Sequence, residues 1–257
     1  MPNQTVEQPF ISVILSFRNE EEVLEELITR LRAVLNLLPI RYELIFVNDA
    51  STDHSLSILT EKAGQDKRIK IINMSRKFGV SECVFAGMEY AKGDAVIYLD
   101  ADLQDPPELI PQLIEKWLNG TDVVYTVRSS RHGESPLKLA LTKHAYRLIA
   151  LVSDLGLPPE AGDFKLISRR VVKQLLELKE RNPYLRGLVR WVGFKQEPVF
   201  YERKQRASGE THFPLFRNFF RDLLTLRGPV GTFINGLTSF SNFPLLLFLL
   251  LGLLISA

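Results

Sequence analysis

AVIYLDADLQD, residues 95–105, is the stretch of this sequence that decides the fold. Its first five residues form a short apolar run, which is typical of a buried β-strand. The run ends in Asp100-Ala101-Asp102, where two carboxylates repel each other unless a cation lies between them. Residues i and i+2 of an extended chain point to the same face, so both carboxylates can reach one ion directly or through water. The pattern predicts a site for Mg²⁺ or Mn²⁺, with Gln104, one more i+2 step along, as a further candidate ligand.

Strand-like and helix-like segments alternate on both sides of this stretch. Before it, we expect strands at 11–15, 42–48 and 69–74 and helices at 20–37, 53–63 and 81–91. After it, Pro106-Pro107 opens a helix that ends near Gly120, and a strand follows at 122–127. Repeated strand–helix units predict an α/β fold in which a mostly parallel sheet is covered by helices.

The regular alternation ends after residue 127. Ser135-Pro136 has the pattern of a helix N-terminus and predicts an amphipathic helix to about Asp154, followed by a loop at 155–163. We then expect a short strand at 164–167, a helix at 168–180 and a last strand at 197–201.

The end of the chain has the composition of a membrane-associated segment. From Thr211 onward apolar residues recur at helical spacing beside arginines, which predicts an interfacial amphipathic helix, with a helix docked on the globular core as the alternative. Residues 243–257 read FPLLLFLLLGLLISA and carry no charge, but they are fewer than the roughly 20 residues that cross a bilayer. We therefore expect a globular domain at 1–210, a juxtamembrane amphipathic region at 211–232 and the start of a truncated transmembrane region at 233–257.

Composition and charge exclude several classes of protein. The formal net charge of +2 is too small to indicate a nucleic-acid-binding protein. The single cysteine, Cys83, excludes an internal disulfide and a Cys-rich zinc site, and we expect it to be a buried thiol in a reducing compartment. The N-terminus lacks the pattern of a secretory signal, and the basic stretch at 203–227 suits anionic lipid headgroups on the cytoplasmic side. We therefore expect the globular domain in the cytoplasm, at the inner or cytoplasmic membrane.

Polar residues follow the first four predicted strands where each one ends. Ligands of open α/β sheets bind outside the carboxyl ends of the strands, so these residues are candidates for a binding site. They are Arg18, Asn19 and Glu20, then Asn48, Asp49 and Asp53, then Arg76 and Lys77, and finally Asp100, Asp102, Gln104 and Asp105. Each group alone also fits an ordinary turn or helix cap. The chain has no P-loop, dinucleotide-binding fingerprint or HExxH motif, so a nucleotide would be held in another way.

Several segments together carry a resemblance to a known family. They are SVILSFRNEEEVLEELI, FVNDASTDHS, NMSRKFGVSECVFAGMEYAKGD and YLDADLQDPPELI, and they resemble family 2 glycosyltransferases. Within that family, TVRSSRHGE, GDFKLISRRVV and YERKQRASGETHF look like the polyprenyl-phosphate glycosyltransferases, such as bactoprenol glucosyltransferases and dolichol-phosphate mannose synthases. Arg190-Trp191 is preceded by Gly187 where processive synthases, with their QxxRW motif, have glutamine, which disfavours a polymerase.

The resemblance implies a fold, a reaction and its partners. The fold would be GT-A, a Rossmann-like domain followed by amphipathic and transmembrane helices. The donor would be a nucleotide-diphosphate sugar, UDP-glucose favoured, with Mg²⁺ or Mn²⁺ as cofactor. A hexose would move with inversion to a polyprenyl (undecaprenyl or dolichyl) phosphate at the cytoplasmic face of the bilayer. A homo-oligomer, specifically a tetramer, is also consistent with the resemblance.

The resemblance also assigns roles by position. The residues around the nucleotide would be Phe17, Asn19, Glu20, Asp49, Arg76, Gly79 and Asp100. Asp102 would be the principal metal ligand and a catalytic residue, assisted by Gln104 and Asp100, while Arg203 and Arg206 would reach the donor phosphates. Asp163 stands where relatives are proposed to have a catalytic carboxylate, although it also fits a turn residue or a partner that orients an arginine.

Three further residues are candidates for the acceptor phosphate. Arg128 follows the fifth strand, and Lys138 and Thr142 are one helical turn apart and so share a face, which would otherwise be an ordinary solvated helix face. Two other functions stay open. A metal-dependent phosphohydrolase also uses paired aspartates, although these normally follow the first strand, and a catalytically inactive membrane-anchored protein could bind the nucleotide sugar without turnover.

Overall fold

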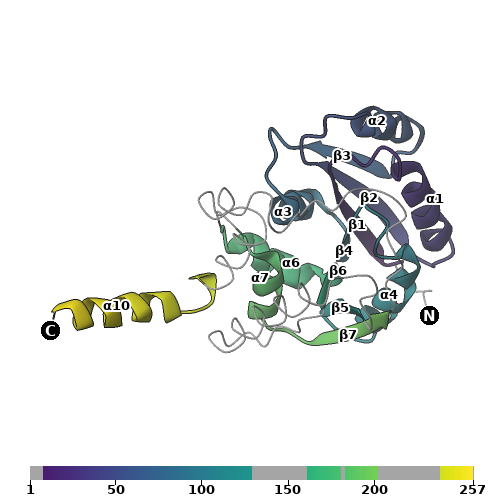
Figure 1. The fold of residues 1–257 in the computed structure, drawn as a ribbon. Helices are drawn as coiled ribbons and strands as arrows, with labels where there is room; N and C mark the ends of the chain where they lie inside the picture. The colour runs from purple at the N-terminus through teal and green to yellow at the C-terminus, as the bar shows by residue number, and fades with distance from the viewer. Residues whose placement is uncertain (1–7, 129–160, 181–182, 202–237, 257) are drawn as a thin grey trace.

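The computed structural model describes residues 8–128, 161–180, 183–201 and 238–256. Over these residues the chain forms a seven-stranded sheet in the order β3-β2-β1-β4-β6-β5-β7 (Figure 1). The strands are β1 (Phe10–Phe17), β2 (Arg41–Asn48), β3 (Ile69–Asn73), β4 (Ala95–Asp100), β5 (Val123–Arg128), β6 (Ala161–Ser168) and β7 (Gln196–Tyr201). β1 runs parallel to β2 and β4, β2 to β3, and β5 to β7. The mostly parallel sheet predicted from the sequence is therefore confirmed.

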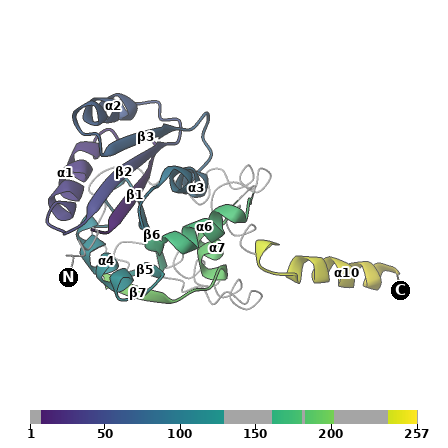
Figure 2. The ribbon, with the colours of Figure 1, turned by 180° about the vertical axis from the view of Figure 1, so that it is seen from behind.

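Helices cover both faces of this sheet, as Figures 1 and 2 show from opposite sides. One face is covered by α1 (Leu24–Leu35), α2 (Ser55–Gln65), the 3-10 helix η1 (Pro107–Leu109) and α4 (Ile110–Leu118), and the other by α3 (Val80–Tyr90), α6 (Arg169–Glu177) and α7 (Leu185–Trp191). Because both faces are covered, the apolar runs of β1, β2 and β4 are almost entirely buried.

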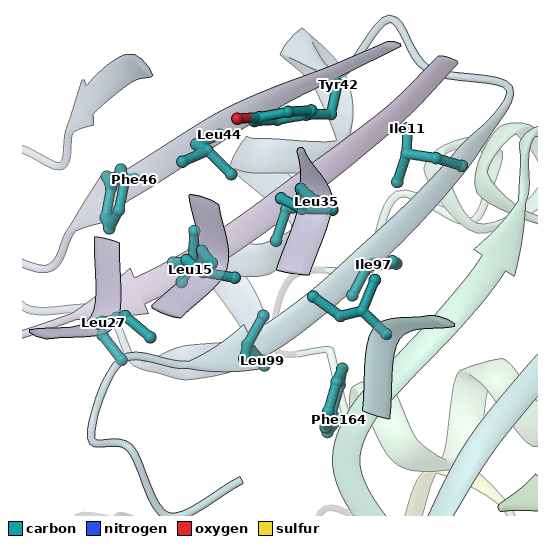
Figure 3. Packing of buried hydrophobic residues seen from close by; sticks show 14 of the residues in the cluster. Ile11, Leu15, Leu27, Leu35, Tyr42, Leu44, Phe46, Ile97, Leu99 and Phe164 are labelled. Atoms are coloured by element: carbon teal, nitrogen blue, oxygen red, sulfur yellow. The ribbon is translucent and has the colours of Figure 1, made fainter. Parts of the chain in front are cut away.

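The packing of α1 shows how the sequence pattern becomes a core. Its buried residues follow the i, i+3, i+4, i+7 spacing of one helix face: Leu24, Leu27, Ile28, Leu31 and Leu35. This spacing places them on one stripe of the helix, which packs against the sheet (Figure 3). Most of the stability of such a helix comes from burying this stripe, not from the helix propensity of its residues.

The structure departs from the sequence predictions between residues 161 and 195. β6 begins at Ala161, so Asp163 lies within a strand and not in the predicted loop at 155–163. β6 lies between β4 and β5 and runs antiparallel to both. Helix α7 was not predicted. The predicted helix at 135–154 and the boundaries at residues 210 and 232 lie outside the described residues.

The apolar end of the chain forms α10 (Phe243–Ser256), which projects away from the globular domain in both views (Figures 1 and 2). Its leucines are exposed, Leu245 by 72% and Leu254 by 77%. Within the described parts of the chain, no helix is both long enough and apolar enough to cross a bilayer.

Cys83 lies in α3 and is fully buried, as the sequence predicts. Burial, together with the nearby carboxylates of Asp49 and Glu82, raises the pKa of its thiol to about 12. Because the thiolate is the reactive form, a thiol reagent at pH 8 should modify Cys83 only when the protein unfolds. The check is the rate of modification in buffer and in increasing urea. Rapid modification of the native protein would contradict the packing of α3 on the sheet.

Candidate active site

The carboxyl ends of β1, β2 and β4 lie side by side and form one edge of the sheet. In the parallel register Ser16 is opposite Asp100, and Phe17 is opposite Asn48. The Ser16 hydroxyl donates a hydrogen bond of 3.2 Å to Oδ1 of Asp100. The polar residues that follow three strands in the sequence are thus brought to one place.

The loops that follow these strands contain residues in the left-handed backbone region. Asn19 (φ 56°), Ala50 (φ 54°) and Leu103 (φ 57°) lie just after β1, β2 and β4. This conformation is uncommon for residues other than glycine, and for Ala and Leu it costs free energy that the surrounding contacts must offset. Such backbone strain is concentrated at this edge, which is typical of a functional site.

Hydrogen bonds join the loop after β1 to the loop after β2. The side-chain oxygen of Asn19 accepts a bond of 2.8 Å from the amide of Thr52, and the Asn19 amide N–H donates to the Ser51 hydroxyl at 3.1 Å. Arg18 donates from Nη1 to the carbonyl oxygens of Asp49 and Ala50, both at 2.5 Å. Asn19 therefore ties two loops together in this structure. Arg18, a candidate from its position after the first strand, belongs to the same network.

Asp49 connects β2 to the loop that contains Arg76 and Gly79. Its carboxylate accepts hydrogen bonds from the backbone N–H of Phe78 at 2.6 Å and of Gly79 at 3.1 Å. The Arg76 guanidinium lies 3.9 Å from the centre of the Phe78 ring. Gly79 has φ 126°, a conformation that side chains other than glycine rarely adopt. The Asp49 carboxylate therefore holds the loop after β3 against the end of β2. Arg76 and Gly79, two other predicted nucleotide-site residues, lie on that loop.

The side chain of Phe17 does not line this edge. It is only 3% exposed and packs edge-to-face against Phe46, with ring centroids 6.3 Å apart. Phe17 continues the buried face formed by Ile11, Val13 and Leu15, and its place around the nucleotide stays a prediction. Its carbonyl oxygen does reach the site region, where it accepts a bond of 3.0 Å from the Asp49 amide. Alternation along β1 was the signal that predicts this burial.

Three carboxylates near the end of β4 are close enough to that of Asp100 to affect its charge. We call Asp100, Asp102, Asp105 and Asp163 the acidic cluster. Burial, together with the charges of Asp163, Asp102 and Asp105, raises the pKa of Asp100 to about 8, against a smaller opposing effect of the Ser16 hydrogen bond. Asp105 is 3% exposed and accepts a hydrogen bond from the Tyr201 hydroxyl. Oδ1 of Asp102 accepts a hydrogen bond of 3.1 Å from the backbone N–H of Gln104.

The antiparallel pairing of β4 with β6 brings Asp163 to this cluster. Tyr98 pairs with Lys165, so the register continued by two residues sets Asp163 opposite Asp100. Both oxygens of Asp163 accept hydrogen bonds from the guanidinium of Arg186 on α7. Asp163 is therefore the partner of an arginine and lies in a strand and not in a turn, and its catalytic role stays a prediction. Arg186 was not among the predicted site residues.

The predicted acceptor and donor-phosphate residues are not described at the level of side chains. The backbone of Arg128 ends β5, opposite Tyr201 of β7. Lys138, Thr142, Arg203 and Arg206 lie outside the described residues.

Glu20 lies on the site edge beside α2, where its backbone N–H donates to the Ser55 hydroxyl at 2.9 Å.

Comparison with known proteins assigns the chain to a family. The sequence model described as "Glycosyl transferase family 2" matches residues 12–176. The chain belongs to glycosyltransferase family 2. It is 45% identical over 245 residues to the uncharacterized glycosyltransferase YkcC of Bacillus subtilis, covering 95% of this chain and 72% of that relative. It is 36% identical over 247 residues to the bactoprenol glucosyl transferase of Shigella phage SfV, covering 96% and 77% respectively.

Solved structures agree on the fold of this glycosyltransferase. Glucosyl-3-phosphoglycerate synthase of Mycobacterium tuberculosis, in complex with Mn²⁺, UDP-glucose and phosphoglyceric acid, aligns with a TM-score of 0.55 at 18% identity over 88% of this chain and 79% of that one. Mannosyl-3-phosphoglycerate synthase of Rubrobacter xylanophilus aligns with a TM-score of 0.55 at 17% identity over 86% and 78%. The glycosyltransferase therefore has the GT-A fold that the sequence predicts.

The acidic cluster fits a divalent cation in one respect and leaves part of the coordination to other groups. Burial and the neighbouring carboxylates favour the neutral form of Asp100. A cation bound nearby would favour its ionised form. The hydroxyl of Tyr98 is buried on the face of the sheet that α3, α6 and α7 cover, and it has no hydrogen-bond partner among the described residues. In the described parts of the chain no three His, Cys, Asp or Glu side chains converge closely enough to form a metal site by themselves. This donor set suits Mg²⁺ or Mn²⁺, which complete their shell with water and substrate phosphates.

The raised pKa of Asp100 has a consequence for stability. Between the ordinary pKa of 3.8 and the folded value of about 8, the folded state of this glycosyltransferase binds more protons than the unfolded state. The metal-free protein should therefore lose stability as pH rises through this range. Asp100→Asn removes the titrating group, so with EDTA present the variant should have a higher Tm than wild type at pH 8, and the difference should shrink towards pH 4.

Asp66→Asn is the matched control for this measurement. Hydrogen bonds from Arg68 lower the pKa of Asp66 to about 2, which is a shift of opposite sign. Its contribution to stability is present above pH 4 and is lost as pH falls through about 2. Asp66→Asn should therefore lower the Tm at pH 8. An equal fall in Tm for both variants at pH 8 would show that the acidic cluster does not destabilise the metal-free protein.

Proposed function

We propose that this glycosyltransferase moves a hexose from a nucleotide-diphosphate sugar to the phosphate of a membrane polyprenol, with inversion at the anomeric carbon. UDP-glucose is the donor we favour, and undecaprenyl or dolichyl phosphate is the acceptor. The observation that carries the proposal is the acidic cluster at the carboxyl edge of the sheet, because it suits a cation shared with a diphosphate. The printed name of the relative from Shigella phage SfV supports a bactoprenol acceptor and a glucosyl group.

Asp102, Asp100 and Gln104 are the residues that would hold the cation. When bound, Mg²⁺ or Mn²⁺ supplies positive charge that stabilises the departing nucleoside diphosphate. The role of the chain is to keep the ligands in place before the donor arrives. The Ser16 hydroxyl orients Asp100, and the backbone N–H of Gln104 orients Asp102. A fixed arrangement of this kind needs little reorganisation during the reaction.

The nucleoside would lie over the loops after β1, β2 and β3. Asp49 is assigned to the nucleobase of the donor, and Asn19, Glu20, Arg76 and Gly79 are assigned to positions around the nucleotide. Since Asp49 already accepts two backbone hydrogen bonds and Asn19 binds Thr52, part of their role is to hold these loops in shape. Arg203 and Arg206 are assigned to the diphosphate of the donor.

The acceptor phosphate needs to be held more than activated. A phosphate monoester has its second pKa near 6, so it is largely a dianion at pH 7 and needs no general base. We assign Arg128, Lys138 and Thr142 to its binding. Asp163, which faces Asp100 across β4 and β6, is assigned to the transfer step and not to binding of the donor.

The apolar end of the chain supports a membrane location for this reaction. The exposed leucines of α10 would lie in a bilayer, following the amphipathic region at 211–232 and the basic stretch at 203–227. By the positive-inside tendency, the catalytic domain would be on the cytoplasmic face. A tetramer stays a prediction.

Incubation of purified protein with labelled nucleotide sugars, Mn²⁺ and polyprenyl phosphate in vesicles tests the proposed function. We expect labelled sugar in the lipid fraction and the free nucleoside diphosphate in the aqueous fraction. A panel of UDP- and GDP-sugars identifies the donor. Release of inorganic phosphate without lipid-linked sugar would indicate a phosphohydrolase instead, and binding of the donor without turnover would indicate a binding protein.

A further inference from the structure

The contact between Asp163 and α7 joins the acidic cluster to a helix that contributes no residue to the proposed site. Arg186 donates from Nε and Nη2 to the two carboxylate oxygens of Asp163, and both side chains are 29% exposed. A guanidinium that binds a carboxylate through two parallel hydrogen bonds fixes the plane of the carboxylate as well as its position. Arg186 therefore determines the direction in which Asp163 faces.

Asp163 needs such a partner because of its neighbours. It lies opposite Asp100, whose own pKa is raised by the charge of Asp163. Without a cation on the far side, repulsion from Asp100 and Asp102 would turn the Asp163 side chain away or draw it into competition for the metal. The guanidinium supplies the opposite charge from the direction of α7.

The helix that carries Arg186 is itself held from two sides. Leu185, Leu188 and Val189 are buried against the face of the sheet that α3 and α6 also cover. On another side, Phe240 packs on α7 at Gly187, where an added Cβ would come within 2.3 Å of the Phe240 ring. The rings of Phe240 and Tyr184 lie 6.3 Å apart. A glycine at position 187, where processive synthases have glutamine, therefore makes room for Phe240.

Phe240 belongs to the segment that leads directly into α10. Only residues 241 and 242 separate it from the first residue of that helix. The chain thus has a continuous series of contacts from the apolar helix through Phe240 and Gly187 to Arg186 and Asp163. Each contact in this series is between described residues.

We infer that Arg186 is a positioning residue for Asp163 in the transfer step, and that the packing of Phe240 on Gly187 holds Arg186 in place. This inference rests on the proposed function, because it assigns Arg186 to the step in which Asp163 takes part. Arg186 does not need to touch the substrate to have this effect.

A double-mutant cycle on Arg186 and Asp163 tests the first part of the inference. Turnover is followed as release of nucleoside diphosphate, and lipid-linked sugar is measured separately. We expect Arg186→Gln to lower kcat about 30-fold while the KM for the donor changes less than about threefold. Because Arg186 acts through Asp163, the double variant with Asp163→Asn should be no slower than Asp163→Asn alone. Arg186→Lys, which keeps the charge but not the paired hydrogen bonds, should recover only part of the rate.

Arg170→Gln is the matched control. Arg170 on α6 forms the same kind of two-oxygen pair with Asp122, at the opposite end of β6. It should leave kcat within about twofold of wild type. If Arg170→Gln slowed turnover as much as Arg186→Gln, loss of any arginine–carboxylate pair would explain the result and the inference would fail. If the fold-losses in kcat of the two single variants multiplied in the double variant, Arg186 would act independently of Asp163. That result would also overturn the inference.

Phe240→Ala tests the second part. We expect kcat to fall about fivefold with unchanged donor KM, while Tyr90→Ala, an exposed aromatic residue at the end of α3, has no effect. Wild-type kcat in Phe240→Ala would show that Phe240 does not hold Arg186. If the wild-type protein released nucleoside diphosphate but formed no lipid-linked sugar, the proposed acceptor would be wrong, and the cycle would still decide the role of Arg186.

Discussion

Asp102→Asn should lower kcat/KM for sugar transfer about 10³-fold, which corresponds to about 4 kcal/mol of transition-state stabilisation. Asn keeps the size of the side chain and its ability to accept the Gln104 amide hydrogen bond, but it loses the negative charge that attracts a divalent cation. Asp102 is also partly exposed, so the fold should tolerate the change. The loss should therefore appear in catalysis and not in stability.

Two measurements check this expectation. Titration calorimetry with UDP should show that Mn²⁺ strengthens binding to wild type much more than to Asp102→Asn, and the Tm of the two proteins should agree within a few degrees. Asp66→Asn, at the C-terminus of α2 and away from the cluster, serves as the control for loss of an aspartate. Normal transfer by Asp102→Asn, with equal nucleotide binding with and without Mn²⁺, would remove Asp102 from the metal site.

Asp163→Asn should lower kcat about 10²-fold or more while the donor binds as in wild type. The substitution removes one charge from the acidic cluster and leaves the Arg186 guanidinium with a neutral partner, so both the charge and the orientation at this position change. Asp102 and Gln104, which follow β4, keep their own oxygen atoms and the charge of Asp102 in this variant. Metal-dependent donor binding should therefore survive.

The measurement is single-turnover transfer with saturating donor, compared with the Kd of UDP in the presence of Mn²⁺. A 10²-fold fall corresponds to about 2.7 kcal/mol. Undiminished turnover would remove Asp163 from the reaction. A large rise in the Kd of UDP would place Asp163 in donor binding instead, and would contradict its assignment to the transfer step.

The first half of the fold was predictable because its signals are local. β1, β2, β3 and β4 are short apolar runs separated by helices with an apolar stripe, and each pattern can be recognised within a window of about ten residues. The same holds for the acidic residues at the end of β4. The rule that ligands bind at the carboxyl ends of parallel strands then brings Asp49 and Asp100 to one edge without further information.

Helix α7 shows why other parts were missed. Its seven residues contain a glycine, so neither helix propensity nor length favours a helix. What stabilises it is burial against the sheet and the packing of Phe240, which comes from more than 50 residues later in the sequence. Arg186 could have been found from sequence only by asking which arginine would balance the charge of Asp163. Several arginines in the chain meet that criterion, and the choice among them depends on the tertiary structure.

The sequence by itself determined that this chain has an α/β domain with paired aspartates after a buried strand, and an apolar helix at its end. These features depend on residues that are neighbours along the chain. Only the tertiary structure decided that Asp163 joins Asp100, because this depends on β6 entering the sheet antiparallel between β4 and β5. The order and direction of strands far apart in sequence are set by the packing of both faces of the sheet. The same packing decided that Phe17 belongs to the core and that Arg186 holds Asp163.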